Sequence, residues 1–397
     1  MAENVSQDEG KTLSHLWRNK ESRAVIIQIV TLVVILIFIG LILRNISINL
    51  KAIGKDFNFD FLFIPAGYDI TFQPILDYSP EDNHLWAGVI GIVNTLLVAI
   101  SGIILATILG FTLGVLRLSS NWLINKMSYV FLEFTRNVPL LLHILFVHAI
   151  ITHTLPIPKN AISLNDTFFL TNRAIYLPEP IFESGFWLTA VAFFAAIVFI
   201  YYFKIWAKKT QDETGQIYPV FWISVAALFG APIIIFLVSG SPLSWGIPVL
   251  KGFNFKGGLA IRPEFIALWL ALSYYTATYI AEIVRGGILA ISYGQTEAAS
   301  ALGLRKNRVL QLILIPQTLR IIIPPLTSQY LNLTKNSSLA IAIGYMDVVA
   351  TIGGISLMQT GKEVETMLIV LLTYLFFSLL ISAIMNFFNR KIRFKER

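Results

Sequence analysis

Two pairs of oppositely charged residues interrupt strongly apolar parts of the sequence. Glu133 precedes Arg136 by three positions, and Glu282 precedes Arg285 by the same interval. On a helix this spacing places both side chains on one face, so each pair can neutralise itself. An arginine fork suits a carboxylate and a glutamate suits an ammonium group, so the pairs are candidates to line a pathway for a zwitterion. The alternative, which we slightly favour, is that they hold helices together near span ends, where buried charge costs less.

A second set of candidates consists of polar side chains within apolar segments. Its members are Asn94, Thr95, Lys335, Asn336, Ser337 and Ser338. The last four follow a segment interrupted by prolines, and broken helices are where transporters place substrate groups. Serine and asparagine also form hydrogen bonds between helices. Substrate contact and helix packing are therefore equally supported interpretations of this set.

The sequence excludes several other kinds of site. It contains 0 cysteines, so disulfides, thiolate metal sites and cysteine nucleophiles are absent. His143, His148 and His153 are five positions apart and do not share one helical face, so we predict no metal site. No GxxxxGKS/T phosphate-binding loop occurs. We therefore predict neither a catalytic residue nor a cofactor bound by this chain.

The composition indicates a membrane protein with an all-α, polytopic fold. Of the 397 residues, 56% are hydrophobic and 13% are charged, against roughly 25% charged residues in soluble domains. Nucleic-acid binding needs a clustered basic face, and a net charge of +7 is too small a surplus in so apolar a chain to indicate one. We therefore expect no nucleic-acid partner. A helix needs about 20 residues to cross about 30 Å of hydrocarbon. Apolar runs of that length predict seven spans, at 24–43, 88–116, 137–158, 184–203, 219–238, 265–291 and 367–389.

An eighth crossing is predicted in the segment 305–352, which is apolar but broken by prolines. We expect a connecting helix up to Pro316 there, followed by one bent or re-entrant span through Tyr330, Lys335 and Ala340. The run at 24–43 exceeds the apolar part of a signal peptide and lacks a cleavage site after it, so we interpret it as a retained anchor. The count is then about eight transmembrane helices.

The distribution of charge between spans predicts the orientation. Lysine and arginine gather at 204–209 and 390–397, whereas acidic residues dominate 44–86. Because basic loops stay cytoplasmic, we expect both termini in the cytoplasm. The long stretches 44–86, 154–183 and 239–262 are then external, and their prolines and glycines predict turns. They serve either as a docking surface for an external partner or as a passive cover of the helix ends.

These observations divide the chain into four parts. They are a cytoplasmic segment at 1–23, a first transmembrane helix and external loop at 24–84, a transmembrane domain at 85–390 with an inserted helix pair at about 154–262, and a basic cytoplasmic tail at 391–397.

A short helical element is predicted after the span 265–291. Ser292 and Gln295 have capping-box spacing, so a helix can begin there. It is expected to end at Gly303, because glycine adopts the left-handed conformation of a C-cap without a Cβ penalty. A second helix is then expected to run to Pro316 and end there. The resulting helix-turn-helix would lie on the cytoplasmic side.

This element resembles the EAA loop of ABC importer permeases. The resemblance includes the spacing from glycine to proline, with isoleucine where leucine usually precedes the proline. The residues that carry it are Glu297, Ala298, Ala299, Gly303, Ile313 and Pro316. Three further stretches, 133–141, 281–287 and 335–339, are similar to the histidine-permease branch, which imports polar amino acids. The whole chain is most similar to the general L-amino-acid permeases of that branch.

The resemblance implies a type I ABC importer permease fold with a cytoplasmic EAA coupling helix. It implies a transport subunit for polar L-amino acids in the bacterial inner membrane, surrounded by membrane lipid. It also implies a dimer of cytoplasmic ATP-binding subunits that use ATP and Mg²⁺, a second homologous permease subunit, and a periplasmic amino-acid-binding protein.

The main alternative is an ion-coupled secondary amino-acid transporter. Such a protein needs acidic groups near the middle of the bilayer as a proton or ion relay. The clear spans contain none. The ABC permease is therefore the preferred interpretation.

Overall fold

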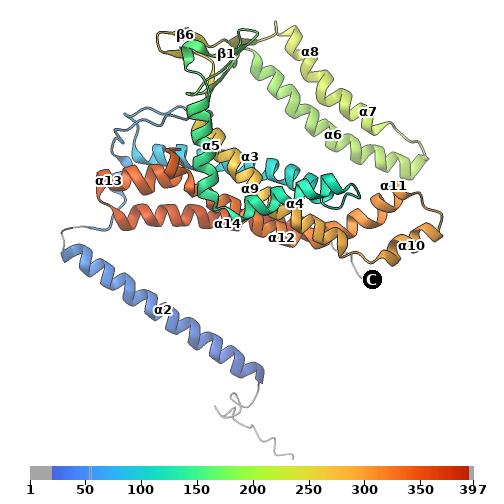
Figure 1. Cartoon of the computed structure of the whole chain (residues 1–397), viewed down its shortest axis with the longest axis horizontal. Helices are drawn as coiled ribbons and strands as arrows, with labels where there is room; N and C mark the ends of the chain where they lie inside the picture. Colours follow the sequence, from blue (N-terminus) through green and yellow to red (C-terminus); the bar gives the residue numbers. More distant parts are fainter. Residues whose placement is uncertain (1–19, 53, 55, 393–397) are drawn as a thin grey trace, which may run out of the picture.

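The computed structural model describes residues 20–52, 54 and 56–392 (Figure 1). Most of the segment at 1–23 and of the tail at 391–397 therefore lies outside the described residues. The helices are α2 (Lys20–Ala52), α3 (His84–Leu116), α4 (Trp122–Asn137), α5 (Leu140–Thr154), α6 (Phe186–Thr214), α7 (Val220–Val225), α8 (Ala231–Val238), α9 (Pro263–Leu289), α10 (Tyr293–Ala301), α11 (Lys306–Val309), α12 (Ile315–Asn336), α13 (Leu357–Thr360) and α14 (Glu363–Ile392). The mostly helical, polytopic architecture predicted from the sequence is confirmed.

Seven helical stretches in the described part of the chain are long and apolar enough to cross a membrane, or eight if the bent pair α4–α5 is one span. The expected number of crossings is therefore confirmed. Figure 1 shows α3, α9, α12 and α14 side by side as a bundle, with α10 at one end. We call this the α10 end. The opposite end of the bundle, where the β-strands join α5 and α9, is called the strand end.

Small residues on α3 let the central helices approach closely. A Cβ atom added at Gly110 would lie 2.5 Å from the side chain of Ile280 on α9, and one at Gly114 would lie 2.8 Å from the carbonyl oxygen of Ala281. Glycine therefore permits a helix contact that a larger side chain would prevent. Leu268, Leu272, Ile322 and Leu333 are fully buried in the same core.

The third predicted span, at 137–158, is wrong in its shape. The helix α5 spans only Leu140–Thr154, and α4 precedes it at an angle of 105°. Pro139 cannot donate a backbone hydrogen bond, and it forces Val138 into an extended conformation (φ −102°, ψ 133°). The more polar lead-in to this span is thus a helix of its own, joined to α5 by a sharp elbow.

The expectation that a helix ends at Pro316 is also wrong. Residues Leu310–Leu314 form a π-helical turn (η4) that continues directly into α12, in which Pro316 occupies the first turn. A π turn is wider than an α turn, so it leaves room for the proline ring and for the missing N–H donor. The same device precedes Pro232, where the π turn η3 (Ala226–Gly230) joins α7 to α8.

Two membrane-spanning regions lie at the margin of the bundle. In the apolar 18-residue stretch of each helix, the share of residues buried by the rest of the protein is 0% for α2 and 6% for α6, against 56% for α9. In Figure 1, α2 stands apart from the bundle, and α6 runs beside α7 and α8 as a separate hairpin. The long apolar surfaces of these helices are available to lipid or to partner subunits.

The long stretches around the inserted hairpin form strands, where the sequence predicted only turns. They contain β1 (Ile162–Leu164), β2 (Phe168–Leu170), β3 (Ile175–Leu177), β4 (Glu179–Phe182), β5 (Leu243–Gly246), β6 (Val249–Lys251), β7 (Asn254–Lys256) and β8 (Leu259–Ile261). All pairs are antiparallel, in the orders β1-β2-β3-β8, β4-β5 and β6-β7. Tyr176 and Phe255 form a small core between them, and burial raises the pKa of the Tyr176 phenol.

The segment between α2 and α3 packs on the strand end of the bundle. The hydroxyl of Tyr68 and the Nδ1 atom of His84 both reach the hydroxyl of Ser356, at 3.2 and 2.8 Å. Burial raises the pKa of the Tyr68 phenol above its ordinary value. The backbone N–H of Asn58 donates to Oε1 of Glu365 at 3.1 Å. These contacts join the start of α3 to the start of α14 through residues that precede both.

Candidate functional site

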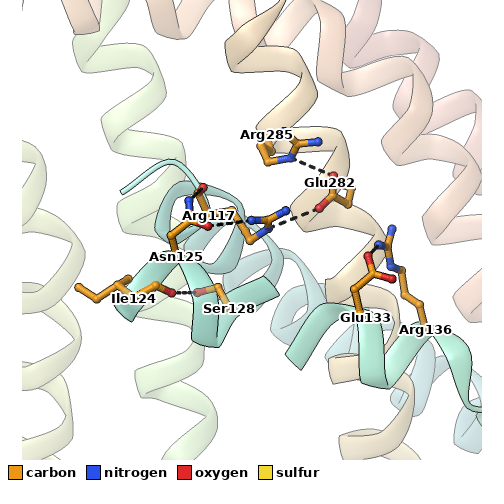
Figure 2. A network of polar contacts seen from close by, with 8 residues as sticks. All are labelled: Arg117, Ile124, Asn125, Ser128, Glu133, Arg136, Glu282 and Arg285. Carbon is orange, nitrogen blue, oxygen red and sulfur yellow. Dashed lines mark hydrogen bonds and ion pairs between the residues drawn. The ribbon is translucent and has the colours of Figure 1, made fainter. Parts of the chain in front are cut away.

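Glu282 on α9 is the centre of a charged cluster near the α10 end. The Nε atom of Arg285 donates to its Oε2 atom at 2.9 Å, and Nε of Arg117 lies 3.8 Å from Oε1. Arg117 follows α3 directly, and its guanidinium also donates to the side chain of Asn125 on α4 at 3.0 Å. Figure 2 shows this chain of contacts from Asn125 to Arg285. The cluster therefore joins α9 to the end of α3 and, through Arg117, to the start of α4.

Arg117 is a residue that the sequence analysis missed. Its side chain is only 14% exposed, and its guanidinium lies 4.8 Å from the centre of the Tyr129 ring. The available signal was a single basic residue at the end of a long uncharged span. Two arginines on one glutamate give the cluster a net positive charge.

The second predicted pair, Glu133 and Arg136, forms an ion pair on α4. Its side chains are 38% and 26% exposed. In the described part of the chain no ion pair joins it to Glu282, although Figure 2 shows both sets in the same region. The i,i+3 spacing predicted both pairs, and the shared carboxylate at Glu282 favours the helix-anchoring interpretation for that one.

The helix α10 agrees closely with the predicted EAA element. It begins after Ser292, and its C-terminus has the Schellman pattern, with Gly303 at a φ of +74°. The N–H of Leu304 donates to the carbonyl of Ala299 at 3.2 Å, and that of Gly303 donates to Ser300 at 2.9 Å. The predicted capping box is wrong, because the Ser292 side chain makes no cap hydrogen bond.

The EAA residues divide into an exposed and an inward-facing set. Glu297, Ala298 and Gly303 are exposed, whereas Ala299 is 2% exposed and packs inward. Ile313 and Pro316 are partly buried in η4 and α12. A cavity of about 1010 Å³ lies between α10 and the ends of α3, α9 and α12, with a mainly apolar lining. The exposed face of α10 is therefore free for a partner.

A polar pocket of about 240 Å³ lies between α9 and α12. Its lining consists of neutral hydrogen-bonding side chains, namely Tyr275, Thr276, Tyr279, Gln329, Asn332 and Asn336. The hydroxyls of Tyr275 and Tyr279 lie 3.1 Å apart. Among the described residues, the three amides have no hydrogen-bond partner. The pocket can thus offer both donors and acceptors to a small polar molecule.

Of the predicted substrate residues, Asn336 alone lines this pocket. The hydroxyls of Ser337 and Ser338 donate to the carbonyls of Thr334 and Lys335, at 2.7 and 2.8 Å, and Lys335 is exposed beside them. Sequence reasoning named the end of α12, including Asn336, and missed Gln329 and Asn332, which line the pocket one to two turns earlier. The available signal was two tyrosines four positions apart on one apolar helix and three amides at three- and four-residue intervals on another. Helix packing explains such a pattern equally well.

Asn94 and Thr95 are fully buried and tie α3 to the loop before η6 (Val349–Ser356). The Asn94 amide donates to the carbonyls of Phe72 and Met346, at 2.9 and 3.0 Å. The Thr95 hydroxyl accepts from the N–H of Val348 at 3.2 Å. These bonds favour the packing interpretation for both residues.

Asp347 is a second residue that the sequence analysis missed. It is fully buried beside this loop, where Oδ1 accepts from the N–H of Ala350 at 2.9 Å and Oδ2 accepts from the hydroxyl of Tyr374 at 3.2 Å. It lies in the proline-broken segment rather than in a clear span, so the search for acidic residues within spans passed over it. Its partners place it at the start of a helical segment, as an N-terminal cap.

Comparison with characterised sequences identifies the family. The general L-amino acid transport system permease protein AapQ of Rhizobium johnstonii is 46% identical over 375 residues, which cover 94% of this chain and 93% of that protein. The chain belongs to the permeases of amino-acid ABC importers. The glutamate/glutamine/aspartate/asparagine transport system permease protein BztB of Rhodobacter capsulatus is 45% identical to this permease, over 98% of each chain. No protein-family model matches the permease.

A solved structure, that of an amino acid ABC transporter with histidines, has a TM-score of 0.45 and 18% sequence identity, over 78% of the permease and 95% of that chain. The type I importer fold expected from the sequence accords with the family assignment. The alternative of an ion-coupled transporter finds no support, because the full-length relatives are ABC permeases.

Proposed function

We propose that this permease forms the pathway for polar L-amino acids, together with a second homologous permease subunit, and that α10 transmits the force of ATP hydrolysis to it. The observation that carries the proposal is the connection between α10 and the pocket. The walls of the pocket are α9 and α12, and α10 lies between these two helices in the chain. A displacement of α10 by a partner would therefore act on both walls of the pocket, on α9 through the turn at 290–292 and on α12 through α11 and η4.

The remaining components follow from the same assembly. A pair of cytoplasmic ATP-binding subunits would hold ATP and Mg²⁺ and would contact Glu297 and Ala298 on the exposed face of α10. A periplasmic binding protein would deliver the amino acid at the strand end. The proposal places the permease in the bacterial inner membrane with both termini in the cytoplasm, as the excess of lysine and arginine at 204–209 and 390–397 favours.

The neutral lining of the pocket supports a substrate with several polar groups rather than one fixed charge. Amides and phenols can bond both an ammonium group and a carboxylate, so they accept an amino-acid backbone whatever its side-chain charge. A buried charge in the lining would instead favour one sign of substrate. The pocket is accordingly suited to acidic and neutral amino acids alike.

The coupling role is tested by Gly303→Val in the complete importer, reconstituted in proteoliposomes. Valine at a φ of +74° strains the turn after α10. We expect import to fall about tenfold or more, which corresponds to about 1.4 kcal/mol. Gly294→Ala is the matched control, because its added Cβ meets only the Ser292 hydroxyl at 3.5 Å. Normal ATP-driven import by a well-assembled Gly303→Val importer would contradict the role of α10.

The substrate role is tested by Asn332→Asp, with Asn332→Gln as the control that keeps an amide. A carboxylate in the pocket should weaken import of glutamate relative to glutamine, because like charges repel across a short distance. We expect the ratio of the two import rates to change by about tenfold, an interaction of about 1.4 kcal/mol. Unchanged selectivity in Asn332→Asp, measured with both amino acids in competition, would remove the pocket from the pathway.

A further inference from the structure

The elbow between α4 and α5 leaves backbone groups of α4 without helical partners. The carbonyls in the last turn of an α-helix have no N–H donor within the helix. Because α4 ends at Asn137 and the chain turns at Pro139 into α5, the carbonyl of Thr135 is one of these groups. Thr135 is 1% exposed, so water does not reach it freely. An unpaired buried carbonyl would destabilise the elbow.

His143, one turn into α5, satisfies this carbonyl. Its Nε2 atom lies 3.1 Å from the carbonyl oxygen of Thr135, and since a carbonyl only accepts, Nε2–H donates. The side chain is 6% exposed. The bond spans the break, so one side chain of α5 holds the end of α4. His143 thereby helps to set the angle between the two helices.

The same imidazole ring packs against the wall of the polar pocket. It meets the ring of Tyr274 edge-on, with centroids 5.3 Å apart, and the ring of Tyr275 at 5.9 Å. Tyr275 lines the pocket, and its hydroxyl shares a hydrogen bond with that of Tyr279, which also lines it. Two successive contacts therefore connect the pocket to the elbow, from Tyr275 to His143 and from His143 to Thr135.

We propose that His143 is a positioning residue that couples occupation of the pocket to the angle of the α4–α5 elbow; this rests on the proposed function of the pocket. An amino acid that bonds the hydroxyls of Tyr275 and Tyr279 restrains the Tyr275 ring. The restrained ring holds the imidazole in the orientation that donates to Thr135. The docked end of α4 then keeps the ion pair of Glu133 and Arg136 in place.

Two substitutions separate the two contacts of His143. His143→Phe keeps an aromatic ring beside Tyr274 and Tyr275 and loses the N–H donor. His143→Gln keeps an N–H donor and loses the ring. His153→Phe, at the exposed end of α5, is the matched control. Each variant is assembled into the complete importer, and both the half-saturating amino-acid concentration and the stimulation of ATP hydrolysis by the loaded binding protein are measured.

We expect the ratio of stimulated to unstimulated hydrolysis to fall about fivefold in His143→Phe and in His143→Gln, since a neutral hydrogen bond or a ring contact changes an equilibrium by about that factor. His153→Phe should retain the wild-type ratio. A role limited to packing would lower the amount of assembled importer without changing the ratio. Wild-type stimulation in both His143 variants would overturn the proposal.

A second measurement follows the α4–α5 elbow as a distance between the two helices. The chain has 0 cysteines, so spin labels at Lys126→Cys on α4 and Phe146→Cys on α5 report one distance. Glutamine with the loaded binding protein should narrow the distance distribution in the otherwise wild-type importer and leave it broad in His143→Phe. Equal narrowing in both would refute the coupling. A wild-type importer that carries no amino acid would refute the proposed function instead, so the two failures are distinguishable.

Discussion

The two Glu–Arg pairs have the same spacing in the sequence and different surroundings in the structure. Glu133 and Arg136 form an isolated pair on α4, with side chains 38% and 26% exposed. Glu282 is 24% exposed and is shared by Arg285 of its own helix and by Arg117 at the end of α3. The same motif is thus a local contact in one place and a junction of three helices in the other.

The difference comes from the packing of α3 on α9, which the three-residue spacing within each pair does not reveal. Gly110 and Gly114 allow the two helices to touch, and this contact carries Arg117 to within 3.8 Å of the Glu282 carboxylate. A pair that gains a third partner from a distant segment should contribute more to stability than a pair within one helix. Substitutions at the two glutamates test this directly.

The largest effect is expected from Glu282→Gln. The change leaves two partly buried arginines without a counter-charge, and a buried unpaired charge costs more than a lost surface pair. Allowing for the partial exposure of all three side chains, we expect a loss of about 2 kcal/mol in unfolding free energy. Unfolding of the purified permease in mixed micelles, followed by tryptophan fluorescence, measures it.

The control for this variant is the double change Glu282→Gln with Arg285→Gln. It leaves one unpaired arginine instead of two, so its stability should lie between that of the wild type and that of the single variant. A double variant less stable than the single one would show that Arg285 contributes through packing rather than charge. Import measured on the same samples shows whether stability and transport change together.

The smallest effect is expected from Glu133→Gln, because its ion pair is more exposed and lies within one helix. Such pairs typically contribute less than about 1 kcal/mol. Arg136→Gln, with the same pair broken from the other side, should match it. A loss as large as that of Glu282→Gln, in the same unfolding assay, would mean that Glu133 has a partner in the assembled importer.

Most of the membrane-spanning architecture could be predicted from the sequence because apolar length alone determines which segments cross a bilayer. The spans at α2, α3, α9 and α14 follow directly from uncharged runs, and Gly303 marks the end of α10 because of its conformational freedom. These features depend on residues close together in the chain. Local periodicity and turn chemistry are sufficient for them.

The pocket, Arg117 and the strands could not be predicted in the same way because each depends on residues that meet only after folding. The pocket joins Tyr275 on α9 to Asn332 on α12. Two strand pairs, β3–β8 and β4–β5, form across the inserted hairpin, and strands of three or four residues leave little alternation to recognise. The helix end predicted at Pro316 is wrong for a related reason, since the π turn that accommodates this proline has no sequence signature as clear as the proline itself.

The pairing of β3 with β8 gives the chain a natural splice point. Leu177 lies directly opposite Leu259, and opposed residues of antiparallel strands have Cα atoms about 5 Å apart. The inserted hairpin is flanked first by the pair β4–β5 and then by the pair β3–β8, so the segment 178–258 leaves and re-enters the molecule at neighbouring strands. A two-residue hairpin turn is enough to close that distance. Deleting residues 178–258 and joining the strands through such a turn would give a shorter permease in which α5 and α9 keep their places.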